Sequence, residues 1–193
     1  MLSPTREPQF PFYTLLISGG HTLFLNSNSL TQHTILVNTR DTAIGDYLDK
    51  IARSLRIPWN GVMPGAALEH YSQINLVSAA TLAADVERWG LPRPFSHFQK
   101  NVPAYSFTGV RTAVEKVVQG GGVSGEEEGR SLGRAAQVVG FEHVVQKCVL
   151  GIKKSGDSKE GNLVVSGGVA CNLAFRRMYA RRWTCADVDC GMR

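Results

Sequence analysis

Two segments of this chain share a phrase in which an apolar run ends at Ser-Gly-Gly. They occupy residues 15–20 and 163–168, so one lies near each end of the 193-residue sequence. A short apolar run that ends in paired glycines predicts a buried strand entering a tight turn. Because glycine lacks a Cβ, such a turn lets a ligand phosphate approach backbone N–H groups, although a plain β-turn explains either copy alone. Two copies favour a two-lobed nucleotide-binding fold built by duplication.

Composition places the chain among globular proteins that contain no membrane-spanning segment. Hydrophobic residues make up 43% and charged residues 19% of the sequence, and its net charge of +5 permits contact with polyanions. No apolar run approaches the ~20 residues of a membrane span, and we recognise no signal or transit peptide at the N-terminus. The cysteines form no C-x-x-C pair, which is typical of intracellular thiols; they are Cys148, Cys171, Cys185 and Cys190.

Strand-like and helix-like patterns alternate along the chain, which predicts the α/β class. Residues 120–129 combine glycines with three glutamates and no apolar face, so we expect a mobile loop there. Strands are predicted at residues 13–17, 22–25, 34–37, 105–109 and 163–166, and helices at 44–55, 110–118, 132–154 and 173–182, with further helix within 66–89.

The helix predicted at residues 44–55 begins just after Asp41, which is expected to be its N-cap. Carboxylates on this helix stand four residues before basic side chains, a spacing that predicts surface ion pairs. These pairs are Asp46 with Lys50 and Asp49 with Arg53.

The first Ser-Gly-Gly turn carries groups that suit phosphate oxygens. Ser18 and Thr22 supply hydroxyls, while Gly19 and Gly20 supply backbone N–H groups. His21 could be a metal ligand, an acid or a structural histidine. The sequence has no H-x-x-x-H or H-E-x-x-H pattern, so we favour a polar residue near a phosphate.

The second turn, with Gly167 and Gly168, carries no charge and suits the flat face of a nucleobase. Asn172 follows closely and could bind a ribose or base edge, or could cap the helix that begins at Leu173. Four arginines on that helix could contact nucleic-acid phosphates or form a solvated helix end. They are Arg176, Arg177, Arg181 and Arg182.

Taken in order, five segments resemble the TsaD family of tRNA N6-adenosine threonylcarbamoyltransferases, most closely its fungal mitochondrial members. The resemblance covers about residues 6–182 and rests on residues 15–22, 41–50, 64–69, 105–112 and 165–172. An older label for this family was glycoprotease, but the chain offers no Ser-His-Asp or H-E-x-x-H arrangement for that activity.

The resemblance implies an actin-like, sugar-kinase-like (ASKHA) ATPase fold with two related lobes around a nucleotide cleft. It implies an acyltransferase that moves the threonylcarbamoyl group of threonylcarbamoyl-AMP to N6 of adenosine 37 in tRNAs that read ANN codons. The implied partners are tRNA, an adenine nucleotide and a second copy of the chain, without a membrane, and the implied location is the mitochondrion.

The same resemblance implies roles for individual residues. The first turn would hold the phosphate and carbamoyl portion, Asp49 the ribose and Asn172 the adenine side, while Ala66 replaces a glycine that lines the nucleotide site. The turn residues concerned are Leu16, Ile17, Ser18, Gly19 and Gly20, with His21, Thr22, Gly167 and Gly168 as further cleft candidates.

The family also implies a divalent metal, held by an H-x-x-x-H pair before the first turn and by an aspartate well beyond Asn172. We find neither within residues 1–193, so we expect a partial domain whose first lobe is incomplete at its N-terminus and whose second is incomplete at its C-terminus. Asp187 stands in only a faintly similar context and is not taken as a ligand. We therefore expect weak or no transfer, the alternatives being an inactive nucleotide-binding or dimerising scaffold of this family, or another ASKHA ATPase.

Overall fold

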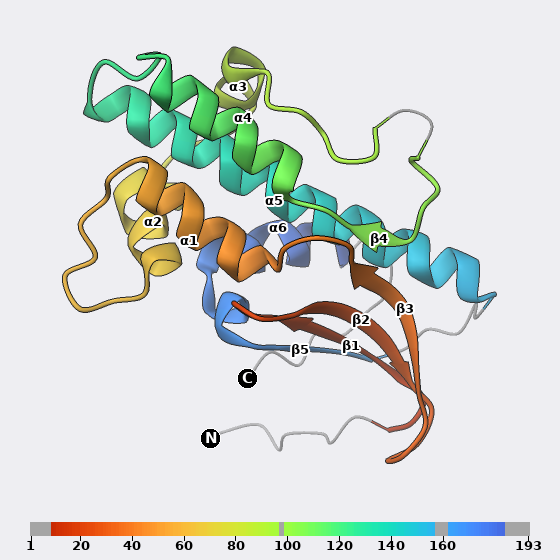
Figure 1. The fold of residues 1–193 in the computed structure, drawn as a ribbon. Coiled ribbons are helices and arrows are strands. Elements are labelled where there is room, and N and C mark those ends of the chain that lie inside the picture. Colours follow the sequence, from red (N-terminus) through yellow and green to blue (C-terminus); the bar gives the residue numbers. More distant parts are fainter. Residues whose placement is uncertain (1–8, 97–98, 157–161, 184–193) are drawn as a thin grey trace.

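The computed structural model describes residues 9–96, 99–156 and 162–183 and shows a five-stranded sheet packed against helices (Figure 1). The strands are β1 (Phe12–Ile17), β2 (Thr22–Ser27), β3 (His33–Thr39), β4 (Ala104–Tyr105) and β5 (Leu163–Ser166). The helices are α1 (Ile44–Ser54), α2 (Pro64–Ser72), α3 (Ala79–Trp89), α4 (Thr108–Gln119), α5 (Glu126–Ser155) and α6 (Leu173–Trp183), with a 3₁₀ turn η1 (Gly168–Cys171) before α6. The α/β class is confirmed.

The sheet has the strand order β4-β3-β2-β1-β5, in which β1 pairs antiparallel with β2 and parallel with β5. The parallel pairing sets Leu15 opposite Val165 and Leu16 opposite Ser166. Both Ser-Gly-Gly turns therefore lie side by side, at the C-terminal ends of two neighbouring strands of the same sheet. In this part of the chain the two copies belong to one sheet, and parallel strands with similar ends can be neighbours without any duplication.

The helices gather on one face of the sheet (Figure 1). The sequence dictates which face, because alternate β1 side chains Tyr13, Leu15 and Ile17 are buried whereas those between them are half-buried. Of the helices in the described ranges, none combines the length and the apolar character needed to cross a membrane.

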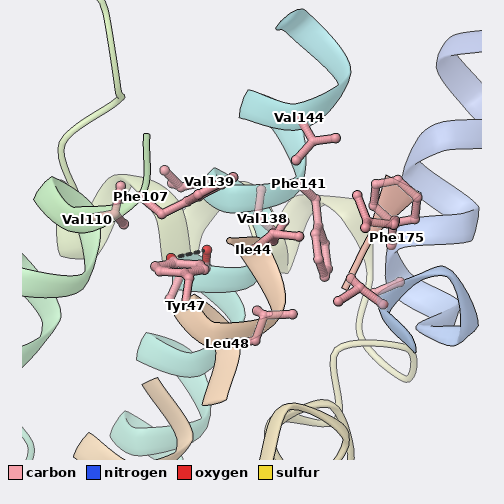
Figure 2. Close-up of a cluster of buried hydrophobic side chains, with 14 of the residues drawn as sticks. Ile44, Tyr47, Leu48, Phe107, Val110, Val138, Val139, Phe141, Val144 and Phe175 are labelled. Carbon is pink, nitrogen blue, oxygen red and sulfur yellow. Dashed lines mark hydrogen bonds between the residues drawn. The ribbon is translucent and has the colours of Figure 1, made fainter. Parts of the chain in front are cut away.

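Helix α5 forms the centre of the core and contacts α1, α2, α3, α4 and α6. Figure 2 shows side chains of α5, among them Val138 and Phe141, meeting Ile44 and Tyr47 from α1 and Phe175 from α6. The buried Tyr47 hydroxyl donates to the carbonyl oxygen of Ala136 at 2.9 Å, which satisfies its polar group inside the core. The core therefore fixes α1 and α6 relative to one another.

Three predicted boundaries are wrong, the first being the strand predicted at residues 105–109, which ends at Tyr105 and is followed by α4 from Thr108. Residues 126–129 form the first turn of α5 rather than a mobile loop, since three glutamates at a helix N-terminus interact favourably with its dipole. Pro64 begins α2, two residues before the helix predicted within residues 66–89, as proline does at the first helical position. That region holds two separate helices, α2 and α3, and Gly156 ends α5 in the left-handed conformation.

Asp41 caps a different helix from the one predicted. The N-cap of α1 is Ala43, which makes no side-chain hydrogen bond there, whereas Asp41 accepts from the backbone N–H of Phe107 at 3.0 Å and Thr108 at 3.3 Å, at the start of α4. Its carboxylate also accepts from the Ser106 hydroxyl at 2.6 Å. Burial raises the pKa of Asp41, but these hydrogen bonds outweigh it and hold the pKa below its ordinary value.

His143 on α5 lies close to this junction and accepts a hydrogen bond from the Ser106 N–H at 3.2 Å through Nε2. Burial, assisted by the charge of Lys147 and opposed by that of Asp41, lowers the pKa of His143 from 6.5 to about 4. Between pH 4 and pH 6.5, His143 is therefore largely protonated in the unfolded chain and neutral in the folded chain. We expect the free energy of unfolding to fall as the pH is lowered from about 6.5 to about 4.

Urea denaturation at several pH values checks this, with His143→Gln as the test variant and His70→Gln, at an exposed position of α2, as the control. The His143 variant should show a flatter pH dependence, whereas the control should keep the slope. An unchanged slope in His143→Gln would contradict a neutral, buried histidine.

Candidate functional site

A cavity of about 720 Å³ opens between the β1–β2 turn, α1, α2 and the segment from η1 into α6. The predicted site residues on its wall are Gly19, Asp49, Ala66, Gly168 and Asn172. Wall residues that sequence reasoning did not assign include Gly45, Leu48, Met63, Gly65, Glu69, Leu76, Val169 and Leu173. Residues separated by more than a hundred positions in the sequence thus share one cavity.

Close backbone contact shapes the floor of this cavity. The Gly45 N–H donates to the carbonyl oxygen of Ser18 at 3.1 Å, and a Cβ at Gly45 would lie 2.6 Å from the backbone nitrogen of Gly19. Only glycine allows α1 to approach the first turn so closely. A lone glycine within a helical pattern could have signalled this contact, because it often marks such an approach.

Asp49 lies on α1 and faces α2 across the cavity wall. Its Oδ1 accepts a hydrogen bond from the Gly65 N–H at 2.7 Å, and among the described residues its other carboxylate oxygen has no hydrogen-bond partner. A Cβ at Gly65 would lie 3.2 Å from Oδ1, so the close backbone approach occurs at Gly65 rather than at the exposed Ala66. The carboxylate is fixed by one oxygen and leaves the other for a ligand.

The opposite wall is the N-terminus of α6. Asn172 is 7% exposed, and its Oδ1 accepts from the Phe175 N–H at 2.9 Å, which confirms the helix-cap alternative. Glu69 of α2 accepts from the Leu173 N–H at 2.8 Å and from the Asn75 side-chain amide at 2.7 Å. These hydrogen bonds tie α2 to α6 across the cavity.

Several predicted residues lie off the cavity wall. Ile17 is fully buried in the core and Leu16 lies half-buried on β1. The buried Thr22 hydroxyl accepts from the Ile44 N–H at 2.8 Å, so it stabilises the start of α1 and is not free for a phosphate. The others occupy turns beside the wall: Ser18 Oγ accepts from the N–H groups of Gly20 and the exposed His21, and Gly167 packs against Ile17.

Only some of the predicted charged residues form the interactions that were expected of them. Lys50 pairs with Asp46 at 2.7 Å as expected, but no ion pair joins Asp49 to Arg53 within the part of the chain that the structure describes. On α6, Arg176 donates to the carbonyl oxygen of Ala170 at 2.7 Å and Arg177 to that of Asn75 at 2.7 Å. The structure does not describe the side chains of Arg181 and Arg182. Cys185, Asp187 and Cys190 lie wholly outside the described residues.

The described residues do not fit a metal site. Nowhere in the described ranges do three side chains of histidine, cysteine, aspartate or glutamate gather closely enough to hold an ion. Asp49 and Glu69 are each engaged by a backbone N–H of the cavity wall. We therefore derive no step that passes through a metal.

The structure is that of an α/β protein with a cavity whose wall carries backbone amides, carboxylates and apolar side chains, a lining with the mixed character of small-molecule sites.

Comparison with known proteins narrows this class. Residues 1–190 match the TsaD family, described as tRNA N6-adenosine threonylcarbamoyltransferase, and the chain belongs to this family. It is 36% identical over 170 residues to the mitochondrial tRNA N6-adenosine threonylcarbamoyltransferase of Schizosaccharomyces pombe, a match that covers 88% of this chain and 40% of the relative. It is 32% identical over 179 residues to the Bordetella parapertussis enzyme of that name, covering 91% of the chain and 47% of the relative. The chain thus spans less than half the length of these relatives.

Proposed function

We propose that this chain binds threonylcarbamoyl-AMP in the cavity and serves the transfer of its threonylcarbamoyl group to N6 of adenosine 37 in ANN-decoding tRNAs. The observation that carries the proposal is the convergence of Gly19, Asp49 and Asn172 on one cavity in a chain of the TsaD family. The reaction forms a bond between N6 and the carbamoyl carbon, breaks the bond from that carbon to the phosphate oxygen, and releases AMP and a proton.

In this proposal the cavity residues bind and orient the adenylate. The free carboxylate oxygen of Asp49 would accept hydrogen bonds from the ribose hydroxyls, and backbone N–H groups near Gly19 would face the phosphate. The side-chain amide nitrogen of Asn172, which has no partner among the described residues, would contact the adenine. Apolar wall residues such as Val169 and Leu173 would pack against the base.

The family membership also supports the coarser features of the proposal. We infer the two-lobed ASKHA architecture for the complete enzyme, with this sheet as part of one lobe, and a homodimer as its assembly. The similarity to the mitochondrial enzyme of S. pombe supports a mitochondrial location.

Asp49→Ala should weaken adenine-nucleotide binding by about 1–3 kcal/mol, because one charged hydrogen-bonding group is lost from the cavity. Titration calorimetry with AMP measures the change. Asp46→Ala is the matched control, since Asp46 lies on the same helix, pairs with Lys50 and is not on the cavity wall. Equal AMP affinity in Asp49→Ala and the parent would remove Asp49 from the site.

Transfer itself is tested by mass spectrometry of digested tRNA after incubation with threonylcarbamoyl-AMP and a divalent cation. Modified adenosine that depends on Asp49 supports the transferase function. Nucleotide binding without transfer would contradict it and leave the nucleotide-binding alternative.

A further inference from the structure

The connection between α1 and α2 swings out from the helices as a wide loop (Figure 1). We call residues 55–61, together with Arg53 in the last turn of α1, the Trp59 loop. Its side chains line an open hollow of about 600 Å³ that is separate from the nucleotide cavity, and the lining residues are Arg53, Arg56, Ile57, Pro58, Trp59, Asn60 and Gly61. The proposed function does not use this surface.

The positive charge of the loop is not neutralised. Arg53 and Arg56 are exposed, and within the described residues neither has a carboxylate at ion-pair distance. Two other exposed arginines do: Arg93 pairs with Glu142 at 2.6 Å, and Arg88 pairs with Glu128. Asp49, four residues before Arg53, and Glu69, the next carboxylate after the loop, bind backbone N–H groups of the cavity wall. Arg53 and Arg56 are therefore available to an anionic partner.

Beside Arg53 the loop presents an aromatic ring. Trp59 is 44% exposed, and the Arg53 guanidinium lies over its ring, 5.4 Å from the centroid. An exposed tryptophan beside unpaired arginines is the arrangement on which single-stranded nucleic acids bind, with bases stacked on the ring and phosphates on the cations.

The backbone holds this arrangement in place. Ile57 is only 5% exposed and its N–H donates to the Ala52 carbonyl oxygen at 3.0 Å, while the Val62 N–H donates to the Trp59 carbonyl oxygen at 2.9 Å. The loop is thus anchored in the core next to the side chains that it exposes, so Trp59 loses little conformational freedom when a partner binds.

The loop also leads directly into the cavity. Met63 and Gly65, which follow it, both lie on the cavity wall, and Met63 is 69% exposed at the rim. An RNA strand on the loop would have its neighbouring nucleotides beside this rim.

We propose that the Trp59 loop is an RNA-docking surface, on which Arg53 and Arg56 bind phosphates and Trp59 stacks on an unpaired base of the tRNA substrate. This inference rests on the proposed function for the identity of the RNA, but not for the binding chemistry. Two unpaired cations favour RNA over a protein partner, for which exposed apolar side chains alone would suffice.

The experiment measures binding of the full 193-residue chain to an unmodified ANN-decoding tRNA transcript by fluorescence anisotropy across a range of salt concentrations. Arg53→Gln/Arg56→Gln should lower the slope of log K against log salt by about one to two, as expected for two lost phosphate contacts. Arg88→Gln/Arg93→Gln changes the net charge equally at arginines that are already paired, and should leave the slope near that of the parent.

Trp59→Ala tests stacking and should weaken tRNA binding roughly five-fold to one-hundred-fold while leaving the salt slope unchanged. A fully paired RNA duplex of equal length offers no unpaired base, so its affinity should not respond to Trp59→Ala. Thermal unfolding of each variant shows that the fold is retained.

Equal losses in the Arg53/Arg56 and Arg88/Arg93 variants would overturn the proposal, because net charge alone would then explain binding. Unchanged tRNA binding in all loop variants would also overturn it. AMP titration of the same variants distinguishes this proposal from the proposed function. If tRNA binding depends on the loop but AMP does not bind, the proposed function is contradicted and the RNA-docking surface is not.

Discussion

Gly167→Ala is expected to lower the free energy of unfolding by about 3–5 kcal/mol, the combined cost of backbone strain and overlap in the core. Gly167 has φ 107° and ψ 168°, a region that is essentially restricted to glycine. An added Cβ would overlap the carbonyl oxygen of Ile17 on the neighbouring strand, and backbone atoms of β1 cannot move aside without disturbing the sheet. Urea denaturation followed by circular dichroism measures the loss.

The adjacent glycine provides a matched control. A Cβ at Gly168 would meet no atom within 4 Å, so Gly168→Ala should change the free energy of unfolding by less than about 1 kcal/mol. Similar losses in the two variants would show that neither the positive φ nor the contact with Ile17 constrains the turn.

Asp85→Ala is expected to destabilise the protein by about 3 kcal/mol, because the buried Arg134 loses its buried partner and keeps only the exposed carboxylate of Glu127, at 2.7 Å. Asp85 accepts from Arg134 Nε at 2.6 Å and from the Ser131 hydroxyl at 2.5 Å, and Trp89 in turn donates to Ser131 at 2.9 Å. This network joins α3 to α5, with Asp85 7% and Arg134 3% exposed. Chemical denaturation of variant and parent measures the difference.

The control for this prediction breaks an exposed ion pair. Glu142→Ala removes the partner of Arg93 at the surface and should cost less than about 1 kcal/mol. Replacing both buried partners, as in Asp85→Leu/Arg134→Met, should recover much of the loss because no buried charge is then left without a buried partner. A double variant as unstable as Asp85→Ala would contradict this explanation.

The sequence was sufficient for elements whose signal is local. Long periodic patterns predicted α5 and α6 to within a few residues, except where glutamates extend the start of α5. Asp41 shows the limit of local reasoning: its capping chemistry was recognised, but the helix that it caps begins at residues more than sixty positions away. Nothing in the local sequence says which helix N-terminus the fold will bring to it.

The residues of the cavity were predicted only in part. The motif residues Gly19, Asp49 and Asn172 do line the cavity, whereas Thr22 stabilises the start of α1. Gly45 and Gly65 were given no role, because each is required only to avoid a steric clash. A Cβ at Gly45 would clash with Ser18 and Gly19, and one at Gly65 would crowd Asp49. Such steric constraints become visible only once the elements are packed.

The parallel pairing of β1 with β5 has a consequence for assembly and for ligand linkage. It joins Tyr13 to Leu163, so the cavity wall at Gly168 and Asn172 reaches Gly19 only after almost the whole chain has been synthesised and paired. Contacts this distant in sequence form late and dissolve with global unfolding. The proposed nucleotide would therefore stabilise the whole of the described fold by mass action rather than one segment of it.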